Sequence, residues 1–277
     1  MRVWQHEAVR VLSWNLWWRY GPWQRRQPAI AATLAELAPD ICGLQEVWGS
    51  EAGNQAAQLA DQLGMHWCWA GRPPRERVEL EHGRLLRFGN AVLSRWPITG
   101  HAELPLPVVG GRQRLALHAR VTAPGGELPV FTTHLSHQPG ASAQRVAQVR
   151  ALAGFVAEHA SGVDYPPVLT GDLNAEPDSD ELRLLGGHLT EPVVPGQVLV
   201  DAWRYAEPGD PGLTWDHRNP YLADDPAPDA RIDYVLVGLP RTGQPRGRVR
   251  SARLAGTGPV AGIWPSDHFA VVAELAD

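Results

Sequence analysis

Strand-like and helix-like segments are mixed along the whole of this chain, and that mixture limits the folds it can adopt. Apolar runs, several of them alternating, predict strands at residues 9–14, 41–44, 66–69, 89–93, 115–121, 128–133, 168–170, 232–237 and 269–274. Helical spacing predicts helices at 27–38, 55–63 and 142–159, and a shorter one capped by Asp178 or Ser179 that ends at Gly186-Gly187. We therefore expect two packed sheets with helices outside. No linker divides the chain, which predicts one domain over residues 1–277.

The composition limits the partners of the protein. Of the 277 residues 20% are charged and 44% hydrophobic, which is ordinary for a globular protein with a core. The formal net charge of -5 does not favour a protein that grips nucleic acid through a broadly basic surface. A local basic patch stays open, because Arg75 and Arg77 lie in an arginine-containing loop that either binds a phosphate-rich ligand or is solvated.

The sequence carries no recognisable membrane or export signal. Residues 1–7 lack the apolar core of a signal peptide, and no apolar stretch is long enough to span a bilayer. We therefore expect a cytoplasmic protein, with a leader removed before this sequence begins as the alternative. We also expect a monomer.

Polar side chains of the kinds used in active sites stand at the ends of predicted strands. Asp172 and Asn174 follow strand 168–170 with a spacing that lets both point the same way. The others in such positions are Asn15, Glu46, His134, Asp233, Asp267 and His268. Each has a structural alternative, such as an Asx turn or a satisfied core histidine. Buried acids and histidines are costly unless paired or bound to a metal, so their recurrence indicates a functional site.

The residue types narrow the chemistry of this site. Oxygen ligands from Glu46, Asp267 and Asn15 suit a hard cation such as Mg²⁺ or Mn²⁺. The sequence lacks zinc-type spacings, a Walker phosphate loop and a Gly-x-Ser-x-Gly motif. A carboxylate beside an amide, as at Asp172 and Asn174, can orient a water and hold an anionic oxygen.

The order of these motifs resembles the endonuclease/exonuclease/phosphatase superfamily, which includes deoxyribonuclease I, exonuclease III, neutral sphingomyelinases and inositol-polyphosphate 5-phosphatases. The resemblance spans nearly the whole chain and rests on Asn15, Gln45-Glu46, His134, Gly171-Asp172-Leu173-Asn174, Arg231-Ile232-Asp233 and Ser266-Asp267-His268. The segment from Gly89 to Ile98 also resembles the family's central strand. The resemblance implies an α+β fold, a four-layer α/β/β/α sandwich of two mixed β-sheets packed face to face, with helices outside and the site at one end.

The resemblance also implies a role for each site residue. Glu46 would be the principal ligand of Mg²⁺ (or Mn²⁺), with Asn15 and Asp267 close to the metal. Asp172 would orient or deprotonate the attacking water, and Asn174 would hold that water or a phosphoryl oxygen.

Two histidines complete the implied machinery. Asp233 would hydrogen-bond His268 and keep its imidazole protonated beside the phosphate. His134 would act as general acid to the leaving oxygen or bind a non-bridging oxygen. Exonuclease III-like repair enzymes carry a tyrosine at the position of His134, whereas deoxyribonuclease I and sphingomyelinases carry a histidine. The resemblance therefore favours the deoxyribonuclease I-like and neutral sphingomyelinase-like branch.

Three further residues are candidates for substrate contact. Arg145, with Gln148, repeats an Arg-x-x-Gln pattern of tyrosyl-DNA phosphodiesterase-like members, and a solvated helix face is the alternative. Trp215 matches a position that lies beside the substrate in some relatives, and Arg231 belongs to the Arg231-Ile232-Asp233 motif.

These observations predict a divalent-metal-dependent hydrolase that cleaves a phosphoester by direct attack of water. We expect a small or lipid-linked phosphodiester or phosphomonoester substrate, because the net charge is negative and the repair-type tyrosine is missing. The alternative is a deoxyribonuclease I-like endonuclease that acts on DNA or RNA. A non-catalytic binding module is disfavoured, because the expected site residues are all present.

Overall fold

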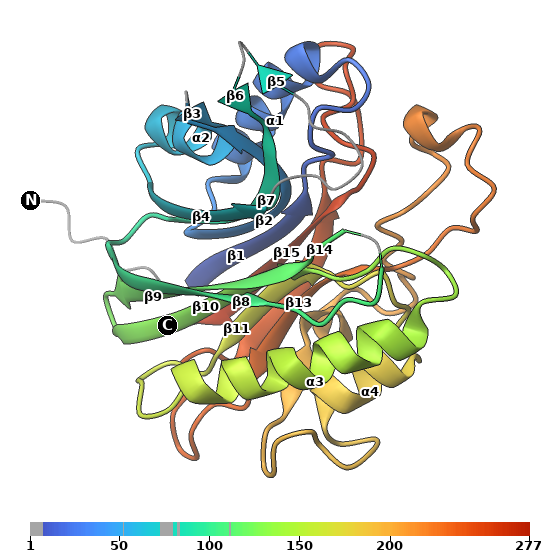
Figure 1. Ribbon diagram of the computed structural model, residues 1–277. Helices are drawn as coiled ribbons and strands as arrows, with labels where there is room; N and C mark the ends of the chain where they lie inside the picture. Colours follow the sequence, from blue (N-terminus) through green and yellow to red (C-terminus); the bar gives the residue numbers. More distant parts are fainter. Residues whose placement is uncertain (1–7, 52, 73–79, 82–83, 111) are drawn as a thin grey trace, which may run out of the picture.

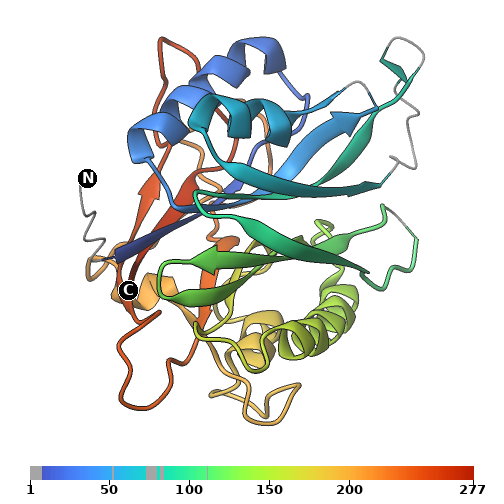
Figure 2. The same ribbon diagram turned by 90° about the vertical axis from the view of Figure 1, so that its left-hand side faces the viewer.

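Two β-sheets pack face to face, and helices cover the outer face of each (Figure 1, Figure 2). The computed structural model describes residues 8–51, 53–72, 80–81, 84–110 and 112–277. Residues 1–7, on which the expectation of no signal peptide rests, lie outside this part of the chain, as do Arg75 and Arg77. The layers confirm the expected α/β/β/α sandwich.

The first sheet has seven strands in the order β14–β15–β1–β2–β7–β4, with the short β3 paired to β2. β1 and β2 are parallel and the other neighbours antiparallel, so this sheet is mixed as predicted. Its strands are β1 (Ala8–Asn15), β2 (Ile41–Ser50), β3 (Gly53–Asn54), β4 (His66–Arg72), β7 (Arg87–Ser94), β14 (Val249–Ala255) and β15 (Ala270–Ala276).

The second sheet has six strands in the order β12–β13–β11–β10–β9–β8. β10 and β11 are parallel and the remaining pairs antiparallel. Its strands are β8 (Ile98–Pro105), β9 (Leu115–Ala123), β10 (Gly126–His134), β11 (Val168–Asp172), β12 (Leu199–Asp201) and β13 (Asp233–Gly238). A separate two-stranded ribbon consists of β5 (Leu80–Glu81) and β6 (Arg84–Leu85).

Helices α1 (Trp23–Leu37) and α2 (Gln55–Leu63) cover the first sheet, and α3 (Ser142–His159) and α4 (Asp180–Gly186) cover the second (Figure 1). Two 3₁₀ turns follow, η1 (Ala202–Tyr205) and η2 (Pro220–Leu222). Ser179 caps α4, as one of the two predicted residues, by accepting a hydrogen bond from the Leu182 amide. No helix in the described ranges is both long and apolar enough to cross a membrane.

The apolar core has three layers because both faces of the central strands are covered. In β1, Val11 points between the sheets and packs with Val130 of the second sheet. Its neighbour Leu12 points the other way and packs against Ile30 and Leu34 of α1. A strand buried on both faces carries apolar residues at successive positions, as Val11 and Leu12 show.

The two sheets approach each other closely at the end where the predicted site residues lie. Gly43 of β2 has no space for a side chain, since a Cβ there would lie 1.7 Å from Oγ1 of Thr170 in β11. One step along, the amide of Gly171 donates a 3.0 Å hydrogen bond to Oγ of Ser13 in β1. The ends of strands from both sheets therefore meet in one place.

Some elements differ from the sequence prediction. The pattern does not predict β8, an edge strand that alternates half-buried and exposed residues, or β14, whose arginines suggest a loop. The pattern starts α1 at Gln27, whereas the helix starts at Trp23 and contains Pro28. That first turn carries Arg26, whose guanidinium binds carbonyl groups of the preceding loop, and this contact cannot be seen in a periodicity.

Candidate active site

The ends of strands from both sheets bring the predicted residues together at one end of the sandwich. Asn15 ends β1, His134 ends β10 and Asp172 ends β11, where β10 and β11 pair in parallel with His134 opposite Asp172. Asp233 begins β13 opposite Asp172, and His268 lies just before β15. Their side chains are buried, as expected for groups that work together.

Two of the predicted residues have a positive backbone φ angle, which residues other than glycine rarely adopt. Glu46 has φ of 54° and lies in a bulge where β2 shifts register against β7. Asn174 has φ of 49° just after β11. Such strain persists where the surrounding structure imposes it, and it is common at functional sites.

Asp172 is the hub of the cluster. Its Oδ2 accepts a 2.9 Å hydrogen bond from Nδ2 of Asn15 and lies 3.3 Å from Nε2 of His134. Its Oδ1 accepts from the amide of Asn174, and Nε2 of His268 lies 3.9 Å from Oδ2. Burial, and then the charge of Asp233, raise the pKa of Asp172 above its ordinary value. This carboxylate is therefore more basic than a solvated aspartate.

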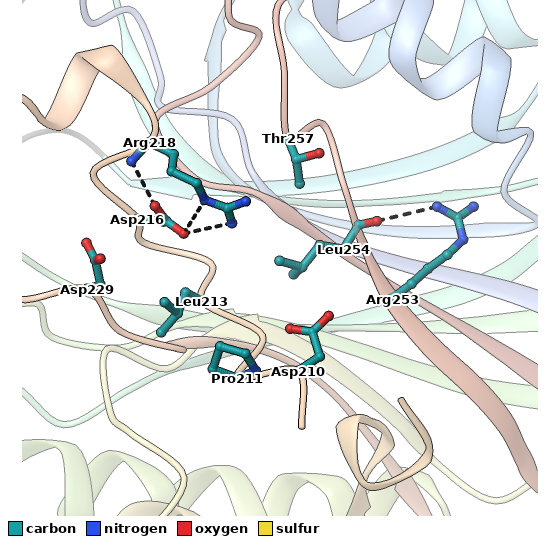
Figure 3. A pocket seen from close by; sticks show the side chains of 9 residues that line it. All are labelled: Asp210, Pro211, Leu213, Asp216, Arg218, Asp229, Arg253, Leu254 and Thr257. Carbon is teal, nitrogen blue, oxygen red and sulfur yellow. Dashed lines mark hydrogen bonds and ion pairs between the residues drawn. The ribbon is translucent and has the colours of Figure 1, made fainter. Parts of the chain in front are cut away.

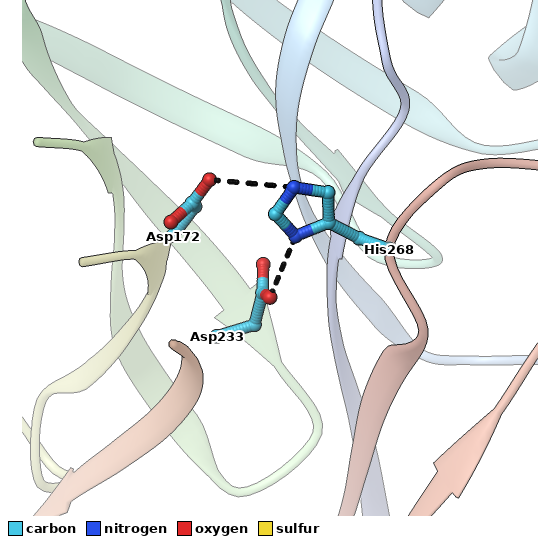
Figure 4. Close-up of side chains that lie close together, drawn as sticks. All are labelled: Asp172, Asp233 and His268. Carbon is cyan, nitrogen blue, oxygen red and sulfur yellow. Dashed lines mark hydrogen bonds and ion pairs between the residues drawn. The ribbon is translucent and has the colours of Figure 1, made fainter. Parts of the chain in front are cut away.

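The surroundings of His268 favour its charged form (Figure 4). Its Nδ1 lies 2.9 Å from Oδ2 of Asp233, which is fully buried. Burial alone would lower the pKa of His268, but Asp233, Asp267 and Asp172 together raise it well above the ordinary value. The imidazolium can donate Nε2–H toward an anionic oxygen.

His134 is neutral by the same reasoning. Burial, then the charges of Arg114 and His268, lower its pKa well below the ordinary value. Its Nδ1 lies 3.8 Å from Oε1 of Glu46 and has no hydrogen-bond partner among the described residues. The site thus favours one charged and one neutral imidazole near the same oxygen, Oδ2, of Asp172.

Glu46 and Asp267 fit a divalent cation. Oε2 of Glu46 is buried and has no hydrogen-bond partner among the described residues, which leaves an acceptor for a bound ion. Burial raises the pKa of Glu46, and burial with the charge of Glu46 raises that of Asp267 to about 7. A cation between these carboxylates would favour their ionised forms.

A different trio also has metal-ligand spacing: Asp172, Asp233 and His268 offer ligand atoms within 4.8 Å of one another. A cation there would have to displace the proton that His268 shares with Asp233. Asn15 is less available than the sequence suggests, because its Oδ1 already accepts from the amide of Trp17 and its Nδ2 binds Asp172.

The two predicted substrate-binding arginines bind groups within the protein. Arg145 donates to Oε1 of Glu181 at 2.8 Å and to the carbonyl oxygens of Ser136 and Gln138. Because Arg145 and Gln148 are buried, the solvated helix face that the sequence leaves open is wrong. Arg231 donates to Asp201 at 2.7 Å. The substrate-binding role of both arginines stays a prediction.

Trp215 lies at the cluster. Its ring meets the His268 ring edge to face, with centroids 4.8 Å apart, and it is half-buried. It can therefore touch a group bound to this imidazole. A cavity of about 640 Å³ on the neighbouring segment is lined by Leu213, Asp216 and Arg253 among others, and no predicted site residue lines it (Figure 3).

Two arginines at the site are not predicted by the sequence. Arg114 is 5% exposed, and its charge acts on Glu46 and Asp172. Arg26 is fully buried and donates to carbonyl oxygens of Leu16 and Pro265, and so ties together the segments that follow Asn15 and precede Asp267. Neither has a local sequence signal, although an apolar run, Leu115-Ala116-Leu117, follows Arg114 directly.

Comparison with known proteins places these features in a family. A model described as the Endonuclease/Exonuclease/phosphatase family matches residues 12–268. YbhP of Escherichia coli strain K12, an uncharacterised protein, is 28% identical over 185 residues, which cover 61% of this chain and 68% of YbhP.

Solved structures share the fold. An endonuclease/exonuclease/phosphatase from Beutenbergia cavernae is 27% identical with a TM-score of 0.71, over 98% of this chain and 72% of that one. D. rerio TDP2, complexed with a single-strand DNA product, is 19% identical with a TM-score of 0.75, over 98% and 99% of the two chains. The catalytic domain of human Nocturnin is 20% identical with a TM-score of 0.70, over 98% and 94%. Since the family model covers most of its length, this chain belongs to the endonuclease/exonuclease/phosphatase family.

Proposed function

We propose that this protein is a divalent-metal-dependent phosphohydrolase that cleaves a phosphoester by direct attack of water. One observation carries the proposal: Oδ2 of Asp172 lies near the rings of both His134 and His268, and Oε2 of Glu46 is buried without a hydrogen-bond partner among the described residues. A base, a neutral imidazole, a cationic donor and an open metal ligand are the parts such a reaction needs. Membership of the family supports the same chemistry.

The side chains of this chain divide the work as follows. Asp172, with its raised pKa, orients the attacking water and accepts its proton, and Asn174 holds that water or a phosphoryl oxygen. His268, held in its charged form by Asp233, donates to a non-bridging oxygen on which negative charge grows in the transition state. His134 faces the same phosphate and can bind an oxygen or protonate the leaving group.

Glu46 and Asp267 would hold the cation, with Asn15 positioning Asp172 next to it. A bound Mg²⁺ or Mn²⁺ supplies charge neutralisation and polarises phosphoryl oxygens. The buried acids Asp172, Asp233 and Asp267 and the partly buried Glu46 lie together with the cations His268, Arg26 and Arg114. A divalent cation would add positive charge and make the site more favourable for an anionic substrate.

The substrate is expected to be a small or lipid-linked phosphodiester or phosphomonoester. His134, in place of the repair-type tyrosine, supports the deoxyribonuclease I-like and neutral sphingomyelinase-like branch. DNA or RNA is the second candidate. The structural likeness to TDP2, which was solved with a single-strand DNA product, supports nucleic acid as a substrate to be tested. The net charge of -5 does not favour such a substrate.

Hydrolysis of bis-(p-nitrophenyl) phosphate tests the proposal. Activity should require Mg²⁺ or Mn²⁺ and disappear in EDTA, and Asp172→Ala and His268→Ala should each lower the rate by at least about 100-fold. Asp229→Ala, which removes an exposed acid paired with His217, is the matched control and should retain full activity. Turnover that persists in EDTA, or near-normal rates in both variants, would overturn the mechanism. A parallel screen of plasmid DNA, RNA, sphingomyelin, inositol phosphates and sugar phosphates identifies the substrate.

A further inference from the structure

A buried arginine beside the active site, Arg114, forms no ion pair with a carboxylate among the residues that the structure describes. Arg114 lies just before β9, and its Nη2 is 3.2 Å from Nδ1 of His137. Its Nη1 is buried and has no hydrogen-bond partner in the described part of the chain. Burial lowers the pKa of Arg114 to about 10, so the guanidinium stays charged at neutral pH. Glu46 and Asp172 act on the charge of Arg114 from a distance, so the unpaired Nη1 leaves a donor for an anion that binds at the site.

A second cation lies on the same side of the site. The guanidinium carbon of Arg112 is 4.3 Å from the centroid of the Phe88 ring, and that of Arg114 is 5.9 Å from it. Arg112 is half-buried and, within the described residues, makes no hydrogen bond or ion pair. Stacking on an aromatic face holds a guanidinium in place while its N–H groups remain available.

Phe88 connects this pair to the reaction centre. Its ring centroid lies 6.0 Å from that of His134, so the two arginines stand on the His134 side of the cluster. Both arginines act on the charge of Glu46. His268 also acts on Glu46, and its ring contacts Asp172 and Asp233. The arginines thus approach the centre from the side of Phe88 and His134, and the imidazolium from the side of Asp233.

We propose that Arg112 and Arg114 form an anion-binding subsite that holds a second phosphate group of the substrate, next to the phosphate being hydrolysed. This inference rests on the proposed phosphohydrolase function and narrows its substrate class. Guanidinium groups match phosphate oxygens with paired hydrogen bonds, and two of them suit a dianionic phosphate. Bis-phosphorylated ligands fit this subsite, whether the second phosphate belongs to a nucleotide or to an inositol headgroup.

Binding measurements test the subsite without relying on turnover. Isothermal titration calorimetry, with Mg²⁺ and again in EDTA, compares adenosine 3′,5′-bisphosphate with adenosine 5′-monophosphate, and inositol 1,4-bisphosphate with inositol 1-phosphate. The wild-type protein should bind the bisphosphate at least about 10-fold more tightly than the monophosphate in one of these pairs. The pair that shows the preference distinguishes a nucleotide source from an inositol source.

Variants then assign the preference to the two arginines. Arg112→Gln and Arg114→Gln should each reduce the ratio of bisphosphate to monophosphate affinity by about 10-fold, and Arg114→Lys should retain part of it. Arg120→Gln is the matched control, because Arg120 lies in β9, the strand that follows both arginines, is exposed and pairs with Glu127 of the β9–β10 hairpin. It makes the same charge change and should leave the ratio unaltered.

The failure of this inference is distinguishable from failure of the hydrolase proposal. A wild-type protein without any bisphosphate preference overturns the subsite, as does a preference that survives in folded Arg112→Gln and Arg114→Gln. Thermal melting of each variant shows that it is folded, and Arg112→Gln changes only a half-buried side chain. If the preference is present and depends on both arginines while bis-(p-nitrophenyl) phosphate is not hydrolysed, the subsite stands and the hydrolase proposal fails.

Discussion

Oδ2 of Asp233 lies 2.9 Å from Nδ1 of His268, and both side chains are buried at the junction of the two sheets. A second pair, Asp229 and His217, has a 2.6 Å contact of the same kind but lies exposed on the surface. The chemistry of the two pairs differs because water screens the exposed one, whereas burial makes the charge of Asp233 act strongly on His268.

Asp233→Asn tests whether the charge of His268 matters. Asparagine keeps the size of the side chain but removes its charge, so the pKa of His268 should fall toward its ordinary value near 6.5. At pH 7 only about a quarter of the His268 side chains would then carry the proton, so we expect a rate at least about 4-fold lower. Because the imidazole of His268 would then lose its proton near pH 6.5, residual activity should decline as pH rises through about 6.5. A pH–rate profile measures this. Asp229→Asn should reproduce the wild-type profile, and a wild-type profile in Asp233→Asn would contradict the role of the pair.

The buried ion pair between Arg145 and Glu181 links α3 to α4 and fixes the turn after His134. Arg145→Met leaves Glu181 buried without a partner and should lower the free energy of unfolding by about 3–5 kcal/mol. The double variant Arg145→Met/Glu181→Leu should recover part of this loss. Urea unfolding measures all three proteins. An Arg145→Met protein of wild-type stability with a raised KM would instead support the predicted substrate contact.

The sequence predicts the sandwich and the strand-end residues well because both follow local rules. Buried strands have continuous apolar runs, and polar groups at their ends are placed together once the strands pair, as His134 and Asp172 are. Contacts made by long side chains between distant segments follow no such rule. Arg145 lies four residues before Val149, on the buried face of α3, but its partner Glu181 in α4 cannot be read from the sequence. Nor does the sequence show that the charge of Arg114 acts on Glu46.

The close approach of the two sheets at Gly43 makes a small substitution costly. In Gly43→Ala the new methyl group would lie 1.7 Å from Oγ1 of Thr170, so strands β2 and β11 must separate. We expect a loss of about 1–3 kcal/mol in the free energy of unfolding, and lower activity because the same strands carry Glu46 and Asp172.

Gly154→Ala in α3 is the control, since no atom lies within 4 Å of its Cβ position. It should stabilise the protein by about 0.5–1 kcal/mol, as alanine does inside a helix. Equal effects of the two substitutions in urea unfolding would contradict this packing.

His118, which lies outside the active site, should make the free energy of unfolding depend on pH. It is buried between the rings of Phe131 and His159, with centroids 4.7 and 4.5 Å away, and burial, then the charge of His159, lower its pKa to about 4. Between pH 4 and about 6.5 the unfolded chain binds a proton that the folded protein does not, so stability should fall as pH drops through this window, by at most about 1.4 kcal/mol per unit. His118→Phe keeps the ring packing and should flatten this slope in urea unfolding at pH 4.5, 5.5 and 7. The exposed control His66→Phe should retain the wild-type slope; an unchanged slope in His118→Phe would show that other groups set it.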